Sequence, residues 1–311
     1  MIYSAMFHHF HDDITYPNSQ GGGSISANDF HAIINHIDEK FNLITPDEFT
    51  QKVVTNTIKE HDICLTFDDS LKCQFDIIYP ELEKRKIKAF FFVYSGAFSD
   101  NPPLLEFFRD FRLNFFKNVD EYYKLFFEII QCTHSEEYKS FLINYNPEYL
   151  SSYPFYTNND KKYRYLRDKV LGDKYFDVVT TMMKEKEYSV SSRRKYLFMS
   201  KDNLRKLHES GHTIGLHSHS HPTTIHNLSY EKQLEEYSKN YQFIHSITNE
   251  KVTSMSHPCG NYNDDTLKIL KKLGIKVGFR PSIMPSNIRS TLEIPREDHT
   301  NIMNKITQQS F

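Results

Sequence analysis

Short apolar runs that alternate with helical segments are the feature that most limits the folds open to this chain. Residues 63–67 (ICLTF) and 87–93 (IKAFFFV) are short and apolar enough for strands buried on both faces. Further strands are expected at 2–7, 212–216, 252–255, 275–279 and 291–294, and helices that begin after Ser26, Ser200, Ser229 and Asn263 lie between them. Repeated strand–helix units favour a parallel sheet covered by helices, and an α/β barrel is the simplest closed form.

The middle of the chain has a different pattern. No glycine occurs between Gly96 and Gly172, and aromatic residues recur at spacings of three and four. This spacing predicts helices. We interpret 101–195 as a helical insertion within the same domain as a barrel built from 1–100 and 196–311. We expect its aromatic residues to form a core, and a lid over the barrel mouth is the alternative.

Charge and cysteine usage exclude several classes of partner. The formal net charge of the 311 residues is -2, so no broad basic surface is expected and nucleic acid is not an expected partner. The amino-terminal sequence does not resemble a signal peptide, and no run of about 18 apolar residues occurs, so no membrane span is expected. The four cysteines form no CxxC pair. We therefore expect reduced thiols and a cytoplasmic protein.

Two adjacent carboxylates, Asp68 and Asp69, follow the apolar run that ends at Phe67. Active sites gather at the carboxyl ends of the strands in parallel sheets and barrels. Adjacent like charges are unfavourable unless a cation is near or one group is protonated. A metal ion would satisfy one carboxylate and leave the other free as a base. A solvated turn is the alternative, and the carboxylate pair alone does not decide between them.

Three alternating histidines, His217, His219 and His221, follow the strand expected at 212–216. Imidazole is the commonest neutral metal ligand, and two histidines four apart can reach one ion if the backbone turns at the strand end. Two imidazoles and one carboxylate leave coordination positions open for water and substrate, which is typical of a catalytic metal site. We expect His217 and His221 to be the ligands and His219 to point elsewhere. With the two carboxylates, a metal site is favoured over a surface histidine cluster.

These two motifs resemble those of a known family. The sequence TFDD at 66–69 is similar to the first motif of the polysaccharide deacetylase family (NodB homology domain, carbohydrate esterase family 4). The sequence HSHSHP at 217–222 is similar to its second motif, H-[ST]-x-x-H-P. The resemblance covers about 1–98 and 197–299. It implies a deformed (β/α) barrel of the polysaccharide deacetylase type, carrying a helical insertion in this chain.

The resemblance also implies a cofactor and residue roles. The cofactor would be a divalent metal ion, usually Zn²⁺ and sometimes Co²⁺, Ni²⁺ or Mn²⁺. Asp69, His217 and His221 would be its ligands, and Asp68 would be the catalytic base.

The sequence departs from the family pattern at three places. Ser70 replaces the glycine that usually follows TFDD. The third motif, R-x-P-Y-G, corresponds to SHPCG at 256–260, so Ser256 stands where arginine is expected. That arginine usually holds the base carboxylate, and Arg296 is the candidate to replace it. We assign Arg296 to the substrate-binding side of the site together with Pro258 and Cys259.

The last motif, L-x-H, supplies the catalytic acid in the family. His299 is the best candidate for this acid because it follows the last expected strand, and a surface histidine is the alternative. His8, His9 and His11 follow the first strand, and we expect them to be bystanders.

The resemblance implies a hydrolase of carbon–nitrogen bonds other than peptide bonds. The expected reaction removes an N-acetyl group from an amino sugar in a glycan or polysaccharide precursor, so the partner would be an acetylated sugar or glycan intermediate. Two alternatives stay open. One is hydrolysis of a non-sugar amide or cyclic ureide on the same fold. The other is a catalytically degenerate protein that binds metal or carbohydrate.

Overall fold

The computed structural model describes residues 4–16, 23–151, 156–281 and 289–309. The chain divides into two compact units. The first comprises Met1–Tyr16, Ser24–Pro103 and Lys195–Phe311, and the second contains Leu104–Arg194. Whether the second unit is an insertion within the domain of the first, as expected for 101–195, stays a prediction.

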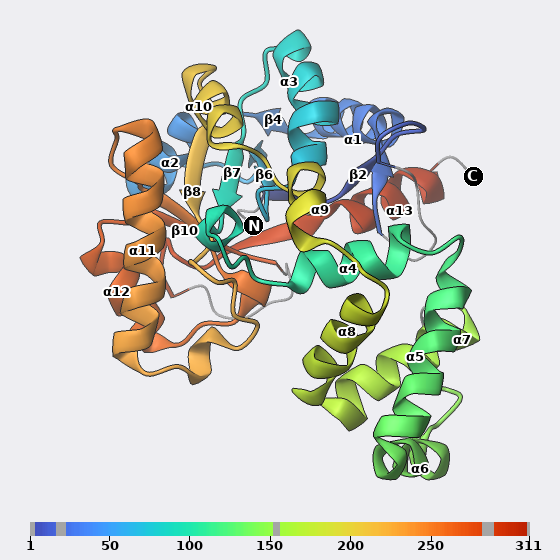
Figure 1. The fold of residues 1–311 in the computed structure, drawn as a ribbon. Coiled ribbons are helices and arrows are strands. Elements are labelled where there is room, and N and C mark those ends of the chain that lie inside the picture. The colour runs from blue at the N-terminus through green and yellow to red at the C-terminus, as the bar shows by residue number, and fades with distance from the viewer. Residues whose placement is uncertain (1–3, 17–22, 152–155, 282–288, 310–311) are drawn as a thin grey trace. The chain divides into compact units, whose positions relative to one another are not determined.

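A closed barrel of seven parallel strands forms the centre of the first unit (Figure 1). The strands are β1 (Ser4–Phe7), β6 (Leu65–Phe67), β7 (Phe90–Val93), β8 (Thr213–Leu216), β9 (Ser254–Ser256), β10 (Val277–Arg280) and β11 (Ile294–Asp298). Each strand pairs with its neighbours in chain order, and β1 pairs with both β6 and β11, which closes the barrel between the first and last strands. All carboxyl ends therefore lie at the same end, and the expected α/β barrel is confirmed.

Aromatic side chains fill the barrel interior. Alternate residues of a strand face the same side, and Phe90 and Phe92 of β7 both meet Phe279 of β10, with ring centroids 5.2 and 5.4 Å apart. Because β7 and β10 are not adjacent in the sheet, these rings meet across the interior. Phe49 of α2 (Pro46–Val54) lies 5.7 Å from Phe279 and closes the amino-terminal end. Arg296 of β11 lies over the Phe92 ring at 5.9 Å, so a charged layer begins above the aromatic one.

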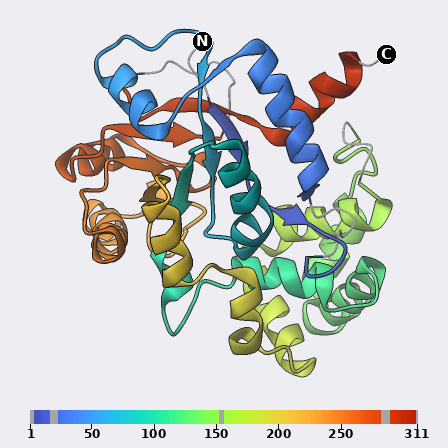
Figure 2. The same cartoon turned by 90° about the horizontal axis from the view of Figure 1, so that it is seen from above.

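Helices cover the outside of the barrel (Figure 2). They are α1 (Ala27–Lys40), α2, α3 (Tyr79–Arg85), α10 (Lys201–Glu209), α11 (Tyr230–Thr248), α12 (Asp264–Lys272) and α13 (His299–Gln309). The predicted caps are present: the hydroxyls of Ser26 and Ser200 accept hydrogen bonds from the third residues of α1 and α10. Two short parallel sheets come between β1 and β6 in the sequence. One pairs β2 (Phe10–His11) with β3 (Ile25–Ser26), and the other pairs β4 (Asn42–Leu43) with β5 (Asp62–Ile63).

Several strands extend further towards their carboxyl ends than the apolar pattern predicted. The run at 63–67 is two strands, because Ile63 pairs with Leu43 of β4 while β6 joins the barrel. The strands expected at 252–255 and 291–294 end at Ser256 and Asp298 instead. The polar residues Ser256 and Arg296 stay in strand geometry because they bond to each other and to Asp68 inside the barrel. The expected strand at 2–7 is present as β1 from Ser4, and residues 2 and 3 lie outside the described part.

The second unit is helical. Its elements are α4 (Leu105–Asn114), α5 (Val119–Thr133), α6 (Ser135–Asn144), α7 (Asn158–Tyr165), the π-helical turn η3 (Leu166–Leu171) and α8 (Lys174–Glu185), and α9 (Val190–Leu197) follows them. Tyr122, Phe126 and Tyr163 pack ring against ring with centroids 5.1 to 5.9 Å apart, as the aromatic spacing predicted for a core. A polar chain runs through this core, in which Arg112 donates to the Tyr123 hydroxyl and that hydroxyl donates to Asp160.

The four cysteines are free, as expected: Cys64 and Cys73 are buried, and Cys132 and Cys259 are exposed. Across the described residues, none of the helices combines the length and the apolar character needed to cross a membrane.

Candidate active site and metal centre

Asp68 and Asp69 leave the barrel at the carboxyl end of β6 on an unusual backbone. Asp69 and Ser70 both have positive φ values, 76° and 59°. The left-handed region favours glycine, which explains why a glycine is usual at the position that Ser70 occupies. The side-chain amide of Gln74 donates to the carbonyl of Asp68 at 2.6 Å and to that of His8 at 2.9 Å. These bonds fix the turn and tie it to the end of β1.

Asp68 forms a buried ion pair with Arg296. The two guanidinium nitrogens of Arg296 donate to the two carboxylate oxygens at 2.7 Å each, a bidentate geometry. Arg296 and Asp68 are 1% and 2% exposed. Burial alone would raise the pKa of Asp68, but the charge and hydrogen bonds of Arg296, together with the nearby His217 and His8, hold the pKa below its usual value. Asp68 is therefore an ionised, oriented carboxylate.

Ser256 completes this pair. Its hydroxyl lies 2.8 Å from a guanidinium nitrogen of Arg296 and 3.2 Å from Asp68. The position where the family usually has arginine thus carries a small residue, and the guanidinium arrives from β11 instead. The sequence suggested two roles for Arg296, holding the base carboxylate or binding substrate. Its bonds to Asp68 match the first role.

Three ligand-type atoms converge beside this pair. Oδ1 of Asp69 lies 3.3 Å from Nε2 of His217 and 3.3 Å from Nε2 of His221, and the two Nε2 atoms are 3.2 Å apart. Ligands about 2.0–2.1 Å from a tetrahedral zinc ion lie roughly 3.3 Å from one another. Because Nδ1 of His217 lies against the carbonyl oxygen of Ser256, the neutral imidazole presents an unprotonated Nε2 to the other two atoms, as a metal ligand must. The donor set therefore fits a divalent metal ion.

The histidine loop turns sharply after β8. Ser218 and His221 have φ values of 63° and 53°, so the chain reverses direction and brings His221 back beside His217. Nδ1 of His217 lies 2.9 Å from the carbonyl oxygen of Ser256, which directs Nε2 towards Asp69. Nδ1 of His219 lies 2.8 Å from the hydroxyl of Ser95. As expected, His219 thus differs from the other two histidines, which face Asp69.

His8 also reaches the site, although the sequence indicated a bystander. Its Nε2 lies 3.7 Å from Asp68 and 3.9 Å from Asp69, and its side chain is 29% exposed. The reason is the register of β1 and β6, in which Phe7 pairs with Phe67, so the next residues along both strands emerge side by side. Only the pairing of the first strand with β6 reveals this neighbour.

The structure places His299 differently from the metal ligands. It begins α13 after β11, and its ring stacks on Phe7 with centroids 6.1 Å apart. Phe7 also packs on Phe30 of α1, so this ring lies in the aromatic layer between the barrel and its helices. His299 is 5% exposed, which is not the surface histidine given as the alternative.

Pro258 and Cys259 lie in the short turn that follows β9, Pro258–Gly260. Cys259 has a φ of 51°. Although part of the Cys259 residue is exposed, desolvation of its thiol group, together with the nearby charges of Asp69 and Asp68, raises the pKa of that thiol to about 11. The thiol is therefore protonated at neutral pH and has little nucleophilic character.

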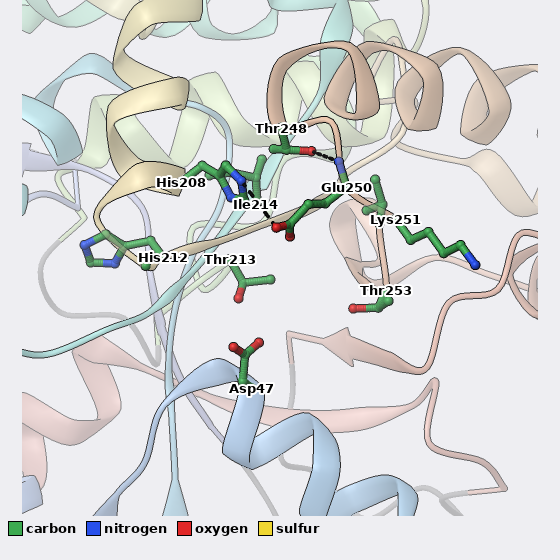
Figure 3. Close-up of a pocket in the computed structure, with 11 residues that line it drawn as sticks. Asp47, His208, His212, Thr213, Ile214, Thr248, Glu250, Lys251 and Thr253 are labelled. Atoms are coloured by element: carbon green, nitrogen blue, oxygen red, sulfur yellow. Dashed lines mark hydrogen bonds and ion pairs between the residues drawn. The ribbon is translucent and has the colours of Figure 1, made fainter.

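A cavity lies at the opposite end of the barrel, where the strands begin. It has a volume of about 240 Å³ and lies beside Thr213, the first residue of β8, and Thr253, which precedes β9. In it, His208 and Glu250 point towards one another, with Nε2 and Oε1 3.9 Å apart (Figure 3). Glu250 is largely exposed, and no third ligand-type group within the described residues converges on this pair. The chemistry of the site thus lies at the carboxyl ends of the strands.

Solved structures of low sequence identity share this fold. A de-N-acetylase from Aggregatibacter actinomycetemcomitans aligns over 98% of each chain with 14% identity and a TM-score of 0.57. The deacetylase PplD from Streptococcus pyogenes aligns over 98% of this chain and 97% of its own, with 16% identity and a TM-score of 0.56. IcaB from Ammonifex degensii aligns over 98% and 96%, with 12% identity and a TM-score of 0.54.

Sequence comparison identifies the family. No curated protein sequence matches the chain. The sequence profile of the family described as polysaccharide deacetylase matches residues 55–111 and 157–278, more than half of the chain. These ranges contain Asp68, Asp69, His217 and His221, whereas His8 and Arg296 lie outside them. The chain belongs to the polysaccharide deacetylase family and is a hydrolase of carbon–nitrogen bonds other than peptide bonds.

Proposed function

We propose that this chain removes an N-acetyl group from an amino sugar in a glycan or polysaccharide precursor, with a divalent metal ion as cofactor. The observation that carries the proposal is the convergence of Asp69, His217 and His221, whose ligand atoms lie 3.2 to 3.3 Å from one another, beside the separate carboxylate of Asp68. A protein that only binds metal has no use for a second, buried and ionised carboxylate next to the ligands.

Asp69, His217 and His221 would hold the ion. Two imidazoles and one carboxylate suit zinc, and cobalt, nickel or manganese are the expected substitutes. An ion bound there would polarise the acyl carbonyl of the substrate and make a water molecule more acidic. Nδ1 of His217 is held by the carbonyl of Ser256, which orients this imidazole before any ion binds.

Asp68 would act as the general base. Its pKa lies below the usual value, so it is ionised at neutral pH and can accept the proton of the attacking water. Arg296 holds both carboxylate oxygens and thereby limits rotation of the base. Arg296 is in this scheme a positioning residue, because its guanidinium is buried beneath Asp68.

The leaving amine needs a proton, and we propose that His8 supplies it. His8 is partly exposed at the barrel mouth and lies within 4 Å of both carboxylates. His299 was the candidate suggested by sequence, and its stacking on Phe7 favours a packing role instead. Pro258 and Cys259 would contact the substrate from the turn after β9, with the Cys259 amide as a donor to the developing oxyanion.

The direct test is acetate release from short oligomers of N-acetylglucosamine by purified protein, before and after metal depletion by a chelator. We expect release that is lost on depletion and restored by zinc. The parallel assay uses non-sugar amides and a cyclic ureide. Hydrolysis of those compounds without acetate release from any N-acetylated sugar would replace the sugar assignment. Failure of the wild-type chain to bind a divalent metal would overturn the proposed mechanism.

A further inference from the structure

One face of α11 carries polar side chains where a barrel-covering helix normally buries apolar ones. Glu236 and Asn240 are four residues apart and therefore lie on the same side of the helix. Asn240 is completely buried, and Glu236 is partly buried. A buried amide is costly unless its hydrogen-bonding groups are satisfied, so the partners of these two side chains show what they stabilise.

Asn240 connects the ends of two neighbouring strands. Its Oδ1 accepts the backbone N–H of His217 at 2.9 Å, and its Nδ2 donates to the carbonyl of Val93 at 2.8 Å. Val93 is the last residue of β7, and His217 is the first residue after β8. The amide therefore fixes the point at which the histidine loop leaves the barrel.

Glu236 holds the middle of the same loop. One carboxylate oxygen accepts the N–H groups of His219 and Ser220 at 3.0 and 2.7 Å, and the other accepts the hydroxyl of Ser220 at 2.8 Å. The loop contains non-glycine residues with positive φ, Ser218 and His221, a conformation that costs free energy and needs support from its surroundings. Glu236 supplies that support from outside the loop.

We propose that Glu236 and Asn240 are positioning residues for the metal centre. They accept the backbone amides of residues 217, 219 and 220 and so set the distance between His217 and His221 without contacting the ion. This inference rests on the proposed function, in which these two histidines bind the metal. Groups that orient metal ligands typically contribute about 10- to 100-fold in metal affinity.

The experiment compares paired variants on α11. Glu236→Ala removes three hydrogen bonds to the loop, and the exposed neighbour Glu235, which pairs with Lys239, provides the control Glu235→Ala. Glu236→Gln is the rescue, because an amide oxygen can accept both backbone N–H groups and the amide nitrogen can donate to Ser220. Rescue by glutamine separates positioning from a simple effect of the carboxylate charge on the cation.

Asn240→Leu is matched by Gln233→Leu. Gln233 is a buried amide on the same helix, and it bonds to the carbonyl of Leu228 and the hydroxyl of Thr266, away from the histidine loop. Both variants remove a buried amide and should lower the unfolding temperature of the metal-free protein to a similar extent. Only Asn240→Leu should weaken metal binding.

Two readouts decide the outcome. Zinc affinity is measured by competition with a chromogenic chelator, and we expect Glu236→Ala and Asn240→Leu to lose about 10- to 100-fold while the other three variants stay within about threefold of wild type. Hydrogen exchange of the peptide that contains residues 217–221 is measured in metal-free protein, and we expect faster exchange in the same two variants. Unchanged affinity and exchange in both variants would overturn the inference, as would equal losses in the controls.

The two readouts also separate this inference from the proposed function. If wild-type protein binds no metal, the proposed function fails, and the role at a metal centre fails with it, whatever the exchange data show. If wild-type protein binds zinc and releases acetate while Glu236→Ala and Asn240→Leu bind zinc normally, only the positioning role fails.

Discussion

The two ends of the barrel are built from the same seven strands but differ in how their charged side chains are placed. At the carboxyl end, Asp68, Asp69 and His217 are buried. Asp69 lies 3.3 Å from His217, and Asp68 lies 2.7 Å from Arg296. At the amino end, Phe49 closes the interior and charged residues lie around an open cavity. Buried charges are costly unless they are paired, and at the carboxyl end Arg296 is the partner of Asp68 while His217 and His221 face Asp69.

The largest difference in activity between variants of the two ends should come from replacing an aspartate at each end. Asp68→Asn keeps a hydrogen-bond acceptor for Arg296 but removes the proposed base, and we expect acetate release to fall by about 10²- to 10⁴-fold with the metal content unchanged. The matched variant Asp47→Asn alters the exposed aspartate of the amino-end cavity and should leave the rate unchanged. Full activity of Asp68→Asn, measured by acetate release, would remove Asp68 from the role of base.

Removal of Arg296 should have the largest effect on stability. Arg296→Met leaves Asp68 buried without its counter-ion, and loss of one partner of a buried ion pair typically lowers the free energy of unfolding by about 3–5 kcal/mol. The control is Arg205→Met, because Arg205 and its partner Asp202 are both exposed, so solvent screens this pair and we expect a much smaller loss. Urea unfolding at pH 7 measures both. Equal losses of unfolding free energy in the two variants would mean that the Asp68–Arg296 pair contributes no more to stability than an exposed ion pair.

A third prediction concerns acid stability, in which the two ends should be alike. Burial lowers the pKa of His257, after β9, to about 4, and burial likewise lowers that of His212, before β8, to about 4. Each folded-state pKa is below the unfolded value of about 6.5, so the unfolded chain binds more protons between these values. The free energy of unfolding should therefore fall as pH decreases from about 6.5 to 4, by roughly 2–3 kcal/mol for His257.

Two isosteric variants test this origin of acid lability. His257→Gln keeps a donor for the carbonyl of Leu292, and His212→Asn keeps an acceptor for the N–H of Ala89. Each should flatten the decrease in unfolding free energy between pH 6.5 and 4, whereas His61→Gln, at an exposed position, should not. A wild-type profile in both variants would assign the acid lability to other groups.

The sequence predicted the parts of the site that depend on local order along the chain. Asp68 and His217 directly follow apolar strands, Asp69 and His221 come shortly after them, and strand ends of a parallel barrel meet at one end whatever the details of packing. His8 was missed because its approach to Asp68 depends on β1 pairing with β6, a contact that closes the barrel and leaves no local signal.

Arg296 and the polar face of α11 show a second reason why parts of the site could not be predicted from the sequence. Arg296 lies 228 positions from Asp68 in sequence, and only its place inside β11, facing the barrel interior, brings the two together. In the sequence, Glu236 and Asn240 look like solvent-facing residues of a helix, because most of their hydrogen-bond partners are backbone groups of another segment. The strand boundaries failed for the same reason, since polar residues inside the barrel do not follow the apolar pattern.

The smallest expected effect is at the amino-end cavity. His208 and Glu250 face each other at 3.9 Å, which is long for an ion pair, and Glu250 is 71% exposed, so solvent screens the interaction. His208→Gln and Glu250→Gln should change the free energy of unfolding by about 0.5 kcal/mol or less and leave acetate release within about twofold of wild type. A tenfold loss of activity in either variant, with metal still bound, would show that the amino end influences the reaction. In that case both ends of the barrel would affect the reaction, and they would differ only in that the carboxyl end contacts the substrate directly.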